Sequence, residues 1–241
     1  MFNKNHIKFQ SLKSTNEFAL SLKGMPVFSE GLLVTTDHQS KGKGQLGSTW
    51  DSASGLNILL SVVIEPKILL NRQFDINKIV TLAIYDFLTS FSSNISVKWP
   101  NDILLDKKKI AGVLIENIVA NNIISYSVIG IGLNVNQLHF QSFSIPATSL
   151  SLHLGGQQDL LSLREVLLDK LTQRIISYRK GKDLDLEYHN ALFLRDEKAS
   201  FVFKDREFTG IIRGVSKKGL LQVEVMRELR EFNMKEIQFI F

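Results

Sequence analysis

Two long apolar runs that follow one another along the chain constrain the fold more than any other feature. The runs cover residues 110–118 and 123–133, and a short turn with the sequence Val-Ala-Asn-Asn separates them. Paired runs of this kind, with two asparagines between them, predict an antiparallel β-hairpin. Further strands are predicted at residues 7–9, 31–36, 57–64, 95–99 and 103–105.

The order of the elements favours an α+β fold. Residues Ser14-Thr15-Asn16-Glu17 have the pattern of a helix capping box, so a helix is predicted from Ser14 to Leu22. Apolar residues at helical spacing predict further helices at residues 74–91, 160–178 and 185–194. Because the strands are grouped as hairpins with helices between the groups, we expect an α+β fold rather than a doubly wound parallel sheet.

The character of the sequence changes after Arg195. Strand-like runs at residues 199–203, 208–215, 220–226 and 232–241 alternate with tight polar turns. Short, evenly spaced strands of this type predict a small β-barrel. We therefore expect two domains, which cover residues 1–194 and residues 195–241.

The composition excludes several classes of protein. The chain of 241 residues has no cysteine, which excludes disulfides, thiolate metal sites and a cysteine nucleophile. Its first residues show no secretory signal, and no apolar run approaches the roughly 18 residues of a membrane span. We therefore expect a cytoplasmic protein with no membrane partner. The net charge of +5 suits anionic small molecules, an acidic protein partner or nucleic acid, and it also fits an ordinary solvated surface.

Residues 97–102, with the sequence Val-Lys-Trp-Pro-Asn-Asp, depart from what a core strand requires. The proline has no N–H group for a sheet, and three of its neighbours are polar. A lysine cluster and a glycine follow at residues 107–112. Lysines at a hairpin tip are commonly just solvated. Together, however, the two stretches favour a strand end that presents polar groups and cations to an anionic ligand.

Residues 37–50 form a loop between two predicted strands that is rich in glycine and lysine. Glycines let backbone N–H groups close around an anion, and lysines neutralise its charge. The glycine spacing is not that of a P-loop, and no helix pattern follows as it does in a Rossmann motif. The loop therefore indicates an anion site of another type or, alternatively, a flexible surface loop that uses glycines for turns.

Five segments resemble the signature motifs of biotin protein ligases, in the family's order and approximate spacing. They are Ser14-Thr15-Asn16, Gln39 with Gly42, Gly44, Gly47 and Trp50, Lys98 to Asp102, Lys109 with Gly112, and Gly130-Ile131-Gly132-Leu133-Asn134-Val135-Asn136. The resemblance implies a catalytic domain like that of class II synthetases, with a mixed or antiparallel sheet and flanking helices. It also implies that the C-terminal barrel is a small SH3-like domain.

The resemblance further implies a ligase reaction in two steps. Biotin and ATP would form biotinyl-5′-adenylate, and the biotinyl group would then pass to a lysine of a biotin carboxyl carrier protein, that of acetyl-CoA carboxylase. The first step brings two anions together, so it requires cations, including Mg²⁺ on the polyphosphate, more than an acid–base pair. We predict no metal ligands among the protein side chains, since the histidines lack metal-ligand spacing.

The resemblance and the chemistry it implies give expected roles to part of the matched residues. Lys109, Lys43 and Gln45 would act on the reacting groups. Biotin would contact Ser14, Thr15, Asn16, Gln39, Gly42, Lys43, Gly44, Gln45, Lys109 and Gly112. The nucleotide would contact Trp50, Lys98, Asn101 and Asn134. Asp102 would orient or accept a proton from the attacking amine, or alternatively cap the following turn.

Two positions of the loop depart from the family pattern. Lys43 stands where the family has its first loop arginine, and this change keeps the charge but loses the planar fork that binds phosphate with two hydrogen bonds. Gln45 stands where the second arginine is found, which removes a cation. We interpret Gln45 as a hydrogen-bond donor that leaves charge balance to Lys41, Lys43 and Lys109, and we expect the adenylate to be held less tightly.

Two other functions remain as alternatives. A lipoate ligase would share the fold, but lipoate ligases lack the segment found at residues 97–102 and use another glycine-rich motif. A biotin-responsive DNA-binding regulator would fit the positive charge. Because the first matched motif begins at Ser14, we expect no helix-turn-helix before it and no nucleic-acid partner. The sequence leaves a homodimer open.

Overall fold

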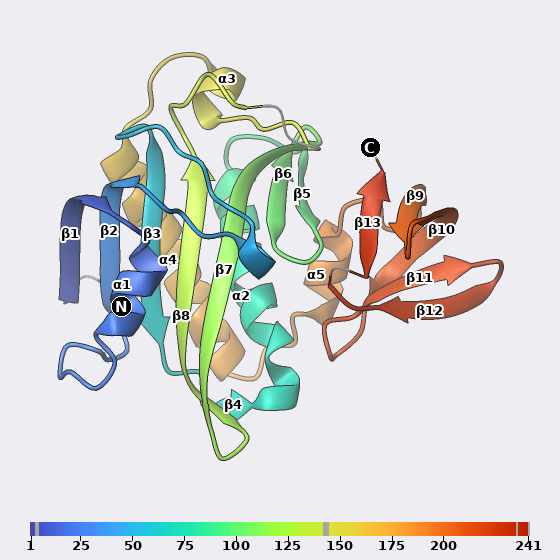
Figure 1. Ribbon diagram of the computed structural model, residues 1–241, viewed down its shortest axis with the longest axis horizontal. Coiled ribbons are helices and arrows are strands. Elements are labelled where there is room, and N and C mark those ends of the chain that lie inside the picture. The colour runs from blue at the N-terminus through green and yellow to red at the C-terminus, as the bar shows by residue number, and fades with distance from the viewer. Residues whose placement is uncertain (3–4, 142–144, 235, 241) are drawn as a thin grey trace.

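A mixed β-sheet forms the centre of the computed structural model, which describes residues 1–2, 5–141, 145–234 and 236–240 (Figure 1). The order in this 8-stranded sheet is β1-β2-β3-β8-β7-β6-β5, and β4 pairs with β8. Strands β1 and β2 pair in parallel, and the other described pairs are antiparallel. The strands are β1 (Asn5–Leu12), β2 (Leu32–Gln39), β3 (Asn57–Ile64), β4 (Ile68–Leu69), β5 (Ile95–Lys98), β6 (Asp102–Leu105), β7 (Lys108–Ala120) and β8 (Ile123–Asn134).

Helices cover both faces of this sheet. The long helices α2 (Phe74–Leu88) and α4 (Leu160–Arg179) pack on one face, and the short helix α1 (Thr15–Ser21) packs on the other. Strand β3 lies between these helices, and every one of its residues is buried. Its alternate side chains point to opposite faces, so Val62 joins the core under α2 while Val63 joins the core with α1. A strand that is covered on both faces needs apolar side chains on both, so its sequence is a nearly continuous apolar run.

Ser14 caps α1 as the sequence predicts, since its hydroxyl accepts a hydrogen bond from the backbone N–H of Glu17 (3.4 Å). The predicted α+β fold, with a mixed sheet and flanking helices, is confirmed. The short helix α5 (Asp185–Ala191) was also predicted, whereas α3 (Leu150–Leu154) and the strand β4 were not. None of the described helices is both long enough and apolar enough to cross a membrane.

A second sheet follows, and it is antiparallel with 5 strands in the order β12-β11-β10-β9-β13. Its strands are β9 (Lys198–Phe203), β10 (Arg206–Val215), β11 (Leu221–Val225), β12 (Glu228–Phe232) and β13 (Ile237–Ile240). The prediction of a separate antiparallel unit is confirmed. The pairings among the described residues leave β12 and β13 at the two edges, so they form an open order and do not themselves close a barrel.

The prediction of one strand across residues 232–241 is wrong. Strand β12 ends at Phe232, and the chain turns before β13 begins at Ile237. Asn233 stabilises this turn, because its side-chain oxygen accepts from Met234 N (2.9 Å) and its backbone N–H donates to the carboxylate of Glu236 (2.7 Å). Residue 241, the end of the predicted strand, lies outside the described part of the chain.

The C-terminal sheet is anchored beside β5 by the turn between β10 and β11. The indole N–H of Trp99 donates to the carbonyl of Gly219 (3.0 Å). A Cβ atom at Gly219 would lie 2.6 Å from the ring of Phe74, so this turn reaches α2 only because a glycine stands there. The anchoring brings β13 to the end of β5, next to the polar segment that the sequence singles out.

Candidate active site

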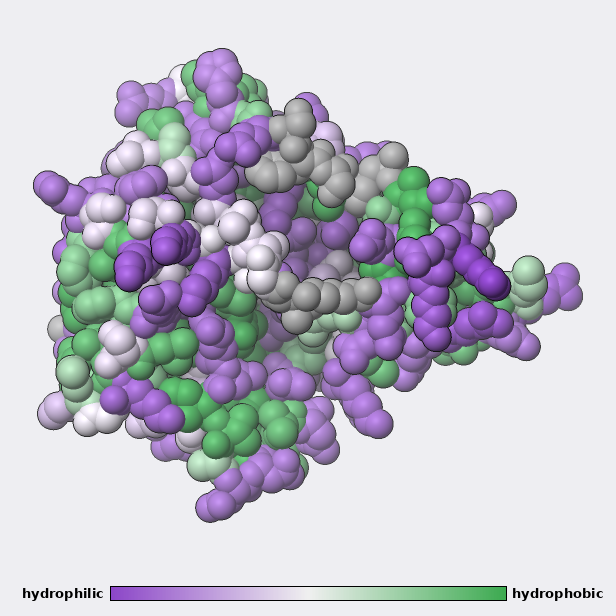
Figure 2. Space-filling model, viewed as in Figure 1, coloured by the Kyte–Doolittle hydropathy of each residue, from purple (hydrophilic) through white to green (hydrophobic). Residues whose placement is uncertain are grey.

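A cavity of about 380 Å³ lies where the large sheet, the glycine-rich loop and the C-terminal sheet meet. Figure 2 shows hydrophilic residues gathered around a hollow at this junction. Most of the residues predicted for the site line this cavity. They are Ser14, Thr15, Asn16, Gln39, Lys43, Gly44, Gln45, Trp50, Lys98, Asn101, Asp102, Lys109 and Gly112.

Strand pairing builds a row of cavity residues across four strands. Lys98 of β5 pairs with Asp102 of β6, and Asp102 pairs in turn with Gly112 of β7. Gly112 pairs with Gly132 of β8. Residues directly opposite one another in an antiparallel sheet point to the same face. The row therefore presents a lysine, a carboxylate and two glycine positions to one side of the cavity.

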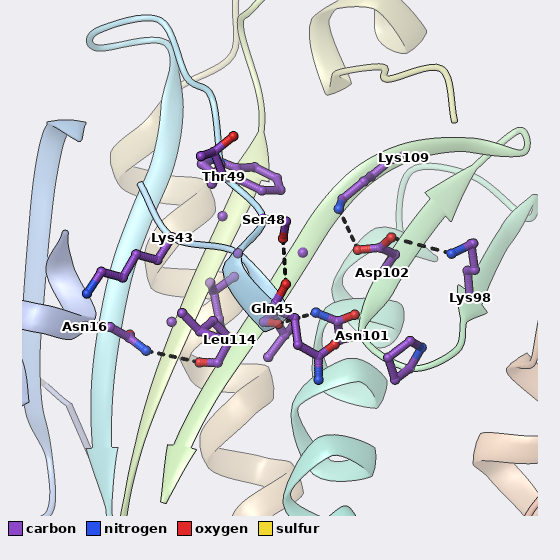
Figure 3. A pocket seen from close by; sticks show the side chains of 18 of the residues that line it. Asn16, Lys43, Gln45, Ser48, Thr49, Lys98, Asn101, Asp102, Lys109 and Leu114 are labelled. Carbon is purple, nitrogen blue, oxygen red and sulfur yellow. Dashed lines mark hydrogen bonds and ion pairs between the residues drawn. The ribbon is translucent and has the colours of Figure 1, made fainter. Parts of the chain in front are cut away.

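A β-bulge turns Lys109 toward the same carboxylate. The register of β6 and β7 shifts next to Ile103, where β7 accommodates an extra residue. Such a bulge changes the direction in which nearby side chains point. As a result, Lys109 Nζ lies 2.6 Å from Asp102 Oδ1, while Lys98 Nζ lies 3.9 Å from Asp102 Oδ2 (Figure 3).

The carboxylate of Asp102 is thus shared between two ammonium groups in a largely buried position. The exposed fraction is 13% for its side chain, 12% for that of Lys98 and 31% for that of Lys109. Burial lowers the pKa of Lys98, while attraction by Asp102 opposes this shift and repulsion by Lys109 adds to it. When both lysines are protonated, the cluster has one more cation than anion, which favours an anionic ligand.

The indole of Trp50 packs on the two glycines of the row. A Cβ atom at Gly132 would lie 2.4 Å from the indole, and one at Gly112 would lie 2.9 Å from it, so neither position has space for a side chain. Lys109 Nζ lies 5.5 Å from the centre of the ring, within the range of a cation–π contact. The buried indole N–H has no hydrogen-bond partner within the described structure, so it is a donor that a ligand could satisfy.

Hydroxyl and amide groups line the other end of the cavity, where Figure 3 shows Asn16 far from Asp102. The side-chain oxygen of Gln39 accepts from the backbone N–H of Thr15 (2.8 Å). Ser61 Oγ lies 2.7 Å from Thr15 Oγ1 and 2.5 Å from Asn16 Oδ1. The amide of Asn16 also donates to the carboxylate of Glu116 (2.8 Å). This network fixes its members and suits the neutral, hydrogen-bonding part of a ligand.

The glycine-rich loop folds back on itself. Gly44 N donates to Ser48 O (2.7 Å), and Trp50 N donates to Gly42 O (2.9 Å). Lys43 forms an ion pair with Glu17 of α1 (2.8 Å), which raises the pKa of the lysine and lowers that of the carboxylate. The resemblance implies that Lys43 and Lys109 both act on the reacting groups, and in this structure Lys43 pairs with Glu17 away from Lys109.

Gln45 makes a contact that the sequence does not suggest. Its side-chain N–H donates to the sulfur of Met234, in the turn before β13, at 2.9 Å. This contact joins the loop to the C-terminal sheet, and both residues line the cavity.

Two predicted residues do not line the cavity. A Cβ atom at Gly42 would lie 2.3 Å from the carbonyl oxygen of Trp50, so this glycine allows the close approach of the two ends of the loop. Asn134 is buried and donates to Thr148 O (3.0 Å). Asn101 lines the cavity, but its amide donates to Val113 O (2.6 Å), which ties it to β7.

Several residues of the site have no role in the sequence-based prediction, although Gly130 belongs to a matched motif. Gly130 lies so close to Asn16 that a Cβ atom there would be 2.5 Å from Asn16 Oδ1. The glycines at positions 130 and 132 indicate that another group approaches the strand closely. Ser61, a lone hydroxyl within the apolar run of β3, was another. Nothing in the sequence pointed to the contribution of β13, through Gln238 and Phe239.

Comparison with known proteins agrees with this geometry. The family model described as "Biotin/lipoate A/B protein ligase family" matches residues 8–134. A biotin–[acetyl-CoA-carboxylase] ligase of Mycobacterium tuberculosis is 28% identical over 220 residues, which cover 88% of this chain and 80% of that protein. The biotin protein ligase of Aquifex aeolicus, solved in complex with biotin and ATP, has the same fold, with a TM-score of 0.79, 24% identity and 98% of each chain covered.

The bifunctional ligase/repressor BirA of Bacillus spizizenii is 32% identical over 156 residues. The match covers 62% of this chain but only 47% of that protein. This chain therefore spans about half the length of its Bacillus relatives. Because the family model covers more than half of the chain and includes most of the cavity residues, the chain belongs to the biotin/lipoate A/B protein ligase family.

Proposed function

We propose that the protein is an ATP-dependent biotin ligase that forms biotinyl-5′-adenylate and transfers the biotinyl group to a lysine of a carrier protein. The observation that carries the proposal is the division of one cavity into two chemically different ends. Hydroxyl and amide groups around Thr15 and Asn16 form one end, and the cluster of Lys98, Asp102 and Lys109 forms the other. Biotin has the same two ends, a neutral ureido ring and a carboxylate.

The neutral end of the cavity suits the ureido ring. A buried ureido group loses its hydrogen bonds to water, which is costly unless the protein replaces them. Thr15, Asn16 and Gln39 provide both donors and acceptors there, and their mutual contacts hold them in position. The side chain of biotin would extend past the indole of Trp50, which covers the two glycines of β7 and β8, toward Lys109.

The charged end suits the first reaction step. The biotin carboxylate attacks the α-phosphate of ATP, a bond to phosphorus forms, and pyrophosphate leaves. Both reactants are anions, so Lys109 and Lys98 would lower the barrier by holding them together and neutralising their charge. The ion pair of Lys43 with Glu17 is exposed, so the lysine can exchange Glu17 for a phosphate at little cost.

The second step requires an attacking amine without its proton. The amine of the carrier lysine attacks the acyl carbon of the adenylate, the C–N bond forms, and AMP leaves with the electrons of the broken C–O bond. Asp102 lies 2.6 Å from Lys109 and can orient the incoming amine or accept its proton. The proton that the amine loses passes to solvent, through that carboxylate if Asp102 accepts it.

ATP would bring Mg²⁺ with it. Within the part of the chain that the structure describes, no group of three or more His, Cys, Asp or Glu side chains is arranged to hold a metal ion. Mg²⁺ commonly keeps several waters and binds through substrate phosphates. We propose that the polyphosphate carries the ion, which would neutralise phosphate charge there.

The proposal extends to the partners and the organisation of the chain. The name of the Mycobacterium tuberculosis relative supports the biotin carboxyl carrier of acetyl-CoA carboxylase as the acceptor. We further propose a cytoplasmic enzyme without a nucleic-acid partner, with a catalytic unit at residues 1–194 and a second unit at residues 195–241. A homodimer is compatible with this arrangement.

Transfer of radiolabelled biotin to a purified carrier domain, with and without ATP, tests the proposal. We expect ATP-dependent labelling of the carrier and formation of biotinyl-5′-adenylate when the carrier is omitted. Calorimetry should show binding of biotin and not of lipoate. The proposal fails if the carrier is not labelled, or if lipoate binds in place of biotin.

A further inference from the structure

The C-terminal sheet contributes an aromatic ring to the charged end of the cavity. Phe239 of β13 lines the cavity, and its ring centre lies 4.8 Å from Lys98 Nζ. This distance is within the range of a cation–π contact, in which the negative face of a ring attracts an ammonium group. Phe201 packs edge-on against Phe239 with 5.2 Å between the ring centres, and so supports its position.

Lys98 needs such a contact because of its surroundings. Only 12% of its side chain is exposed, and a buried ammonium is costly unless nearby groups compensate for lost water. The carboxylate of Asp102 faces it from β6, at 3.9 Å, and Lys109 of β7 faces it as a like charge. Burial and this repulsion both lower the pKa of Lys98. A ring face that attracts the ammonium group opposes this shift and helps the lysine to stay charged.

We propose that Phe239 is a positioning residue of the ligation site, and that it acts by holding the charged form of Lys98 against Asp102. Through this contact the C-terminal sheet fixes the carboxylate that lies next to Lys109. The inference rests on the proposed ligase function, and it adds a residue to which no matched motif assigns a role. It also gives the C-terminal sheet a direct part in the site.

The test is a double-mutant cycle on the transfer step. Single-turnover transfer from biotinyl-5′-adenylate to the carrier domain would be measured for Phe239→Leu, Lys98→Met and the double variant. Phe239→Leu keeps apolar volume but removes the ring face, so we expect a loss of up to about threefold, measured on the alkaline side of the pH profile. In the Lys98→Met background the same change should cost nothing further, because the two residues act as one unit. Phe239→Tyr keeps a ring face, so its rate should equal that of the unchanged protein.

Phe208→Leu is the matched control. Phe208 lies in the same sheet, packs on the same Phe201 and is also partly buried, but it does not line the cavity. We expect its transfer rate to equal that of the unchanged protein. Equal losses in Phe208→Leu and Phe239→Leu would overturn the inference, since they would indicate a general packing effect.

A pH profile separates positioning from packing. If Phe239 stabilises the charged lysine, Phe239→Leu should move the alkaline limb of the transfer rate to lower pH, by about half a unit. A uniform loss at every pH, or additive losses in the cycle, would overturn the inference. An unchanged protein that transfers no biotin would instead overturn the proposed function, so the two failures are distinguishable.

Discussion

The two regions that carry the predicted catalytic cations are built very differently. The lysines of the sheet, Lys98 and Lys109, lie on paired strands and share one largely buried carboxylate. The lysine of the glycine-rich loop, Lys43, is half exposed and pairs with a half-exposed Glu17. Strand pairing determines the first arrangement, whereas one surface ion pair maintains the second.

This difference indicates a division of labour. Charges fixed in a buried site need no reorganisation when the reaction occurs, so they can stabilise the transition state strongly. An exposed ion pair contributes little and is easily exchanged for a ligand. We therefore expect the sheet lysines to determine the rate of the chemistry, and the loop to determine how long the intermediate stays bound.

Removal of the charge at Lys109 should have the largest effect. Lys109→Met keeps the length of the side chain but leaves Asp102 without its nearest cation, at the end of the cavity where the proposed reaction brings two anions together. We expect the rate of biotinyl-5′-adenylate formation to fall about 100-fold or more. Pyrophosphate release in the absence of carrier measures this step.

Lys107→Met is the matched control for that variant. Lys107 lies in the turn of the same hairpin, is exposed and does not line the cavity. Its rate should equal that of the unchanged protein. Full activity of Lys109→Met would refute both the charge argument and the contrast between the two regions.

A methyl group at Gly132 should give the next largest effect. The added Cβ would lie 2.4 Å from the indole of Trp50, so the last residue of the loop could no longer pack on the sheet. Overpacking of this kind costs about 1–3 kcal/mol, and we expect biotin affinity to fall about tenfold or more. Gly112→Ala, where the nearest atom is at 2.9 Å, should cost less. Calorimetric titration with biotin would show the order, and the reverse order would contradict the packing argument.

Helices and strands that are determined by neighbouring residues could be predicted from the sequence. Strand β3 has the predicted bounds, because burial on both faces makes it a continuous apolar run. Helix α1 begins where the capping box places it, since a cap depends on neighbouring residues alone. The resemblance named most of the residues that line the cavity, whereas their roles stay predictions.

What escaped prediction depends on pairing between distant parts of the chain. The direction of Lys109 follows from a bulge between β6 and β7, and a bulge is a property of two strands. The pairing of Lys43 with Glu17 and the contact of Phe239 with Lys98 each join segments far apart in sequence. The apolar residues of the run 232–241 predict one strand, but the turn at Asn233 divides it.

Gln45→Arg probes the loop at a smaller scale. An arginine at this position would restore a cation where the adenylate phosphate collects, while it would remove the hydrogen bond to Met234. We expect the adenylate to leave the enzyme about threefold more slowly, because a charge-assisted contact replaces a neutral one at a partly exposed site. Release of labelled biotinyl-5′-adenylate in a chase experiment measures this rate. Gln45→Met, which adds no charge, is the control. If release from Gln45→Arg is not slower than from the unchanged protein, the charge interpretation of this position is wrong.

Disruption of the surface ion pair should have the smallest effect. Glu17→Gln removes the partner of Lys43, and since both side chains are half exposed we expect the KM for ATP to change less than about twofold. Lys23→Met is a suitable control, because Lys23 is an exposed lysine just after the helix that carries Glu17 and does not line the cavity. A tenfold change in KM would mean that Glu17 restrains the lysine strongly, and the contrast with the sheet lysines would then be lost.

The pair should also make a pH-dependent contribution to stability. The hydrogen bond from Lys43 lowers the pKa of Glu17 below the ordinary 4.5. The carboxylate therefore binds a proton less readily in the folded state than in the unfolded state. The contribution is therefore complete above pH 4.5 and is lost as the pH falls through the lower, folded-state value. Thermal melting of the unchanged protein and of Glu17→Gln should differ slightly at neutral pH and converge in strong acid. A difference that persists or grows in acid would mean that the carboxylate stabilises the fold through some contact other than Lys43.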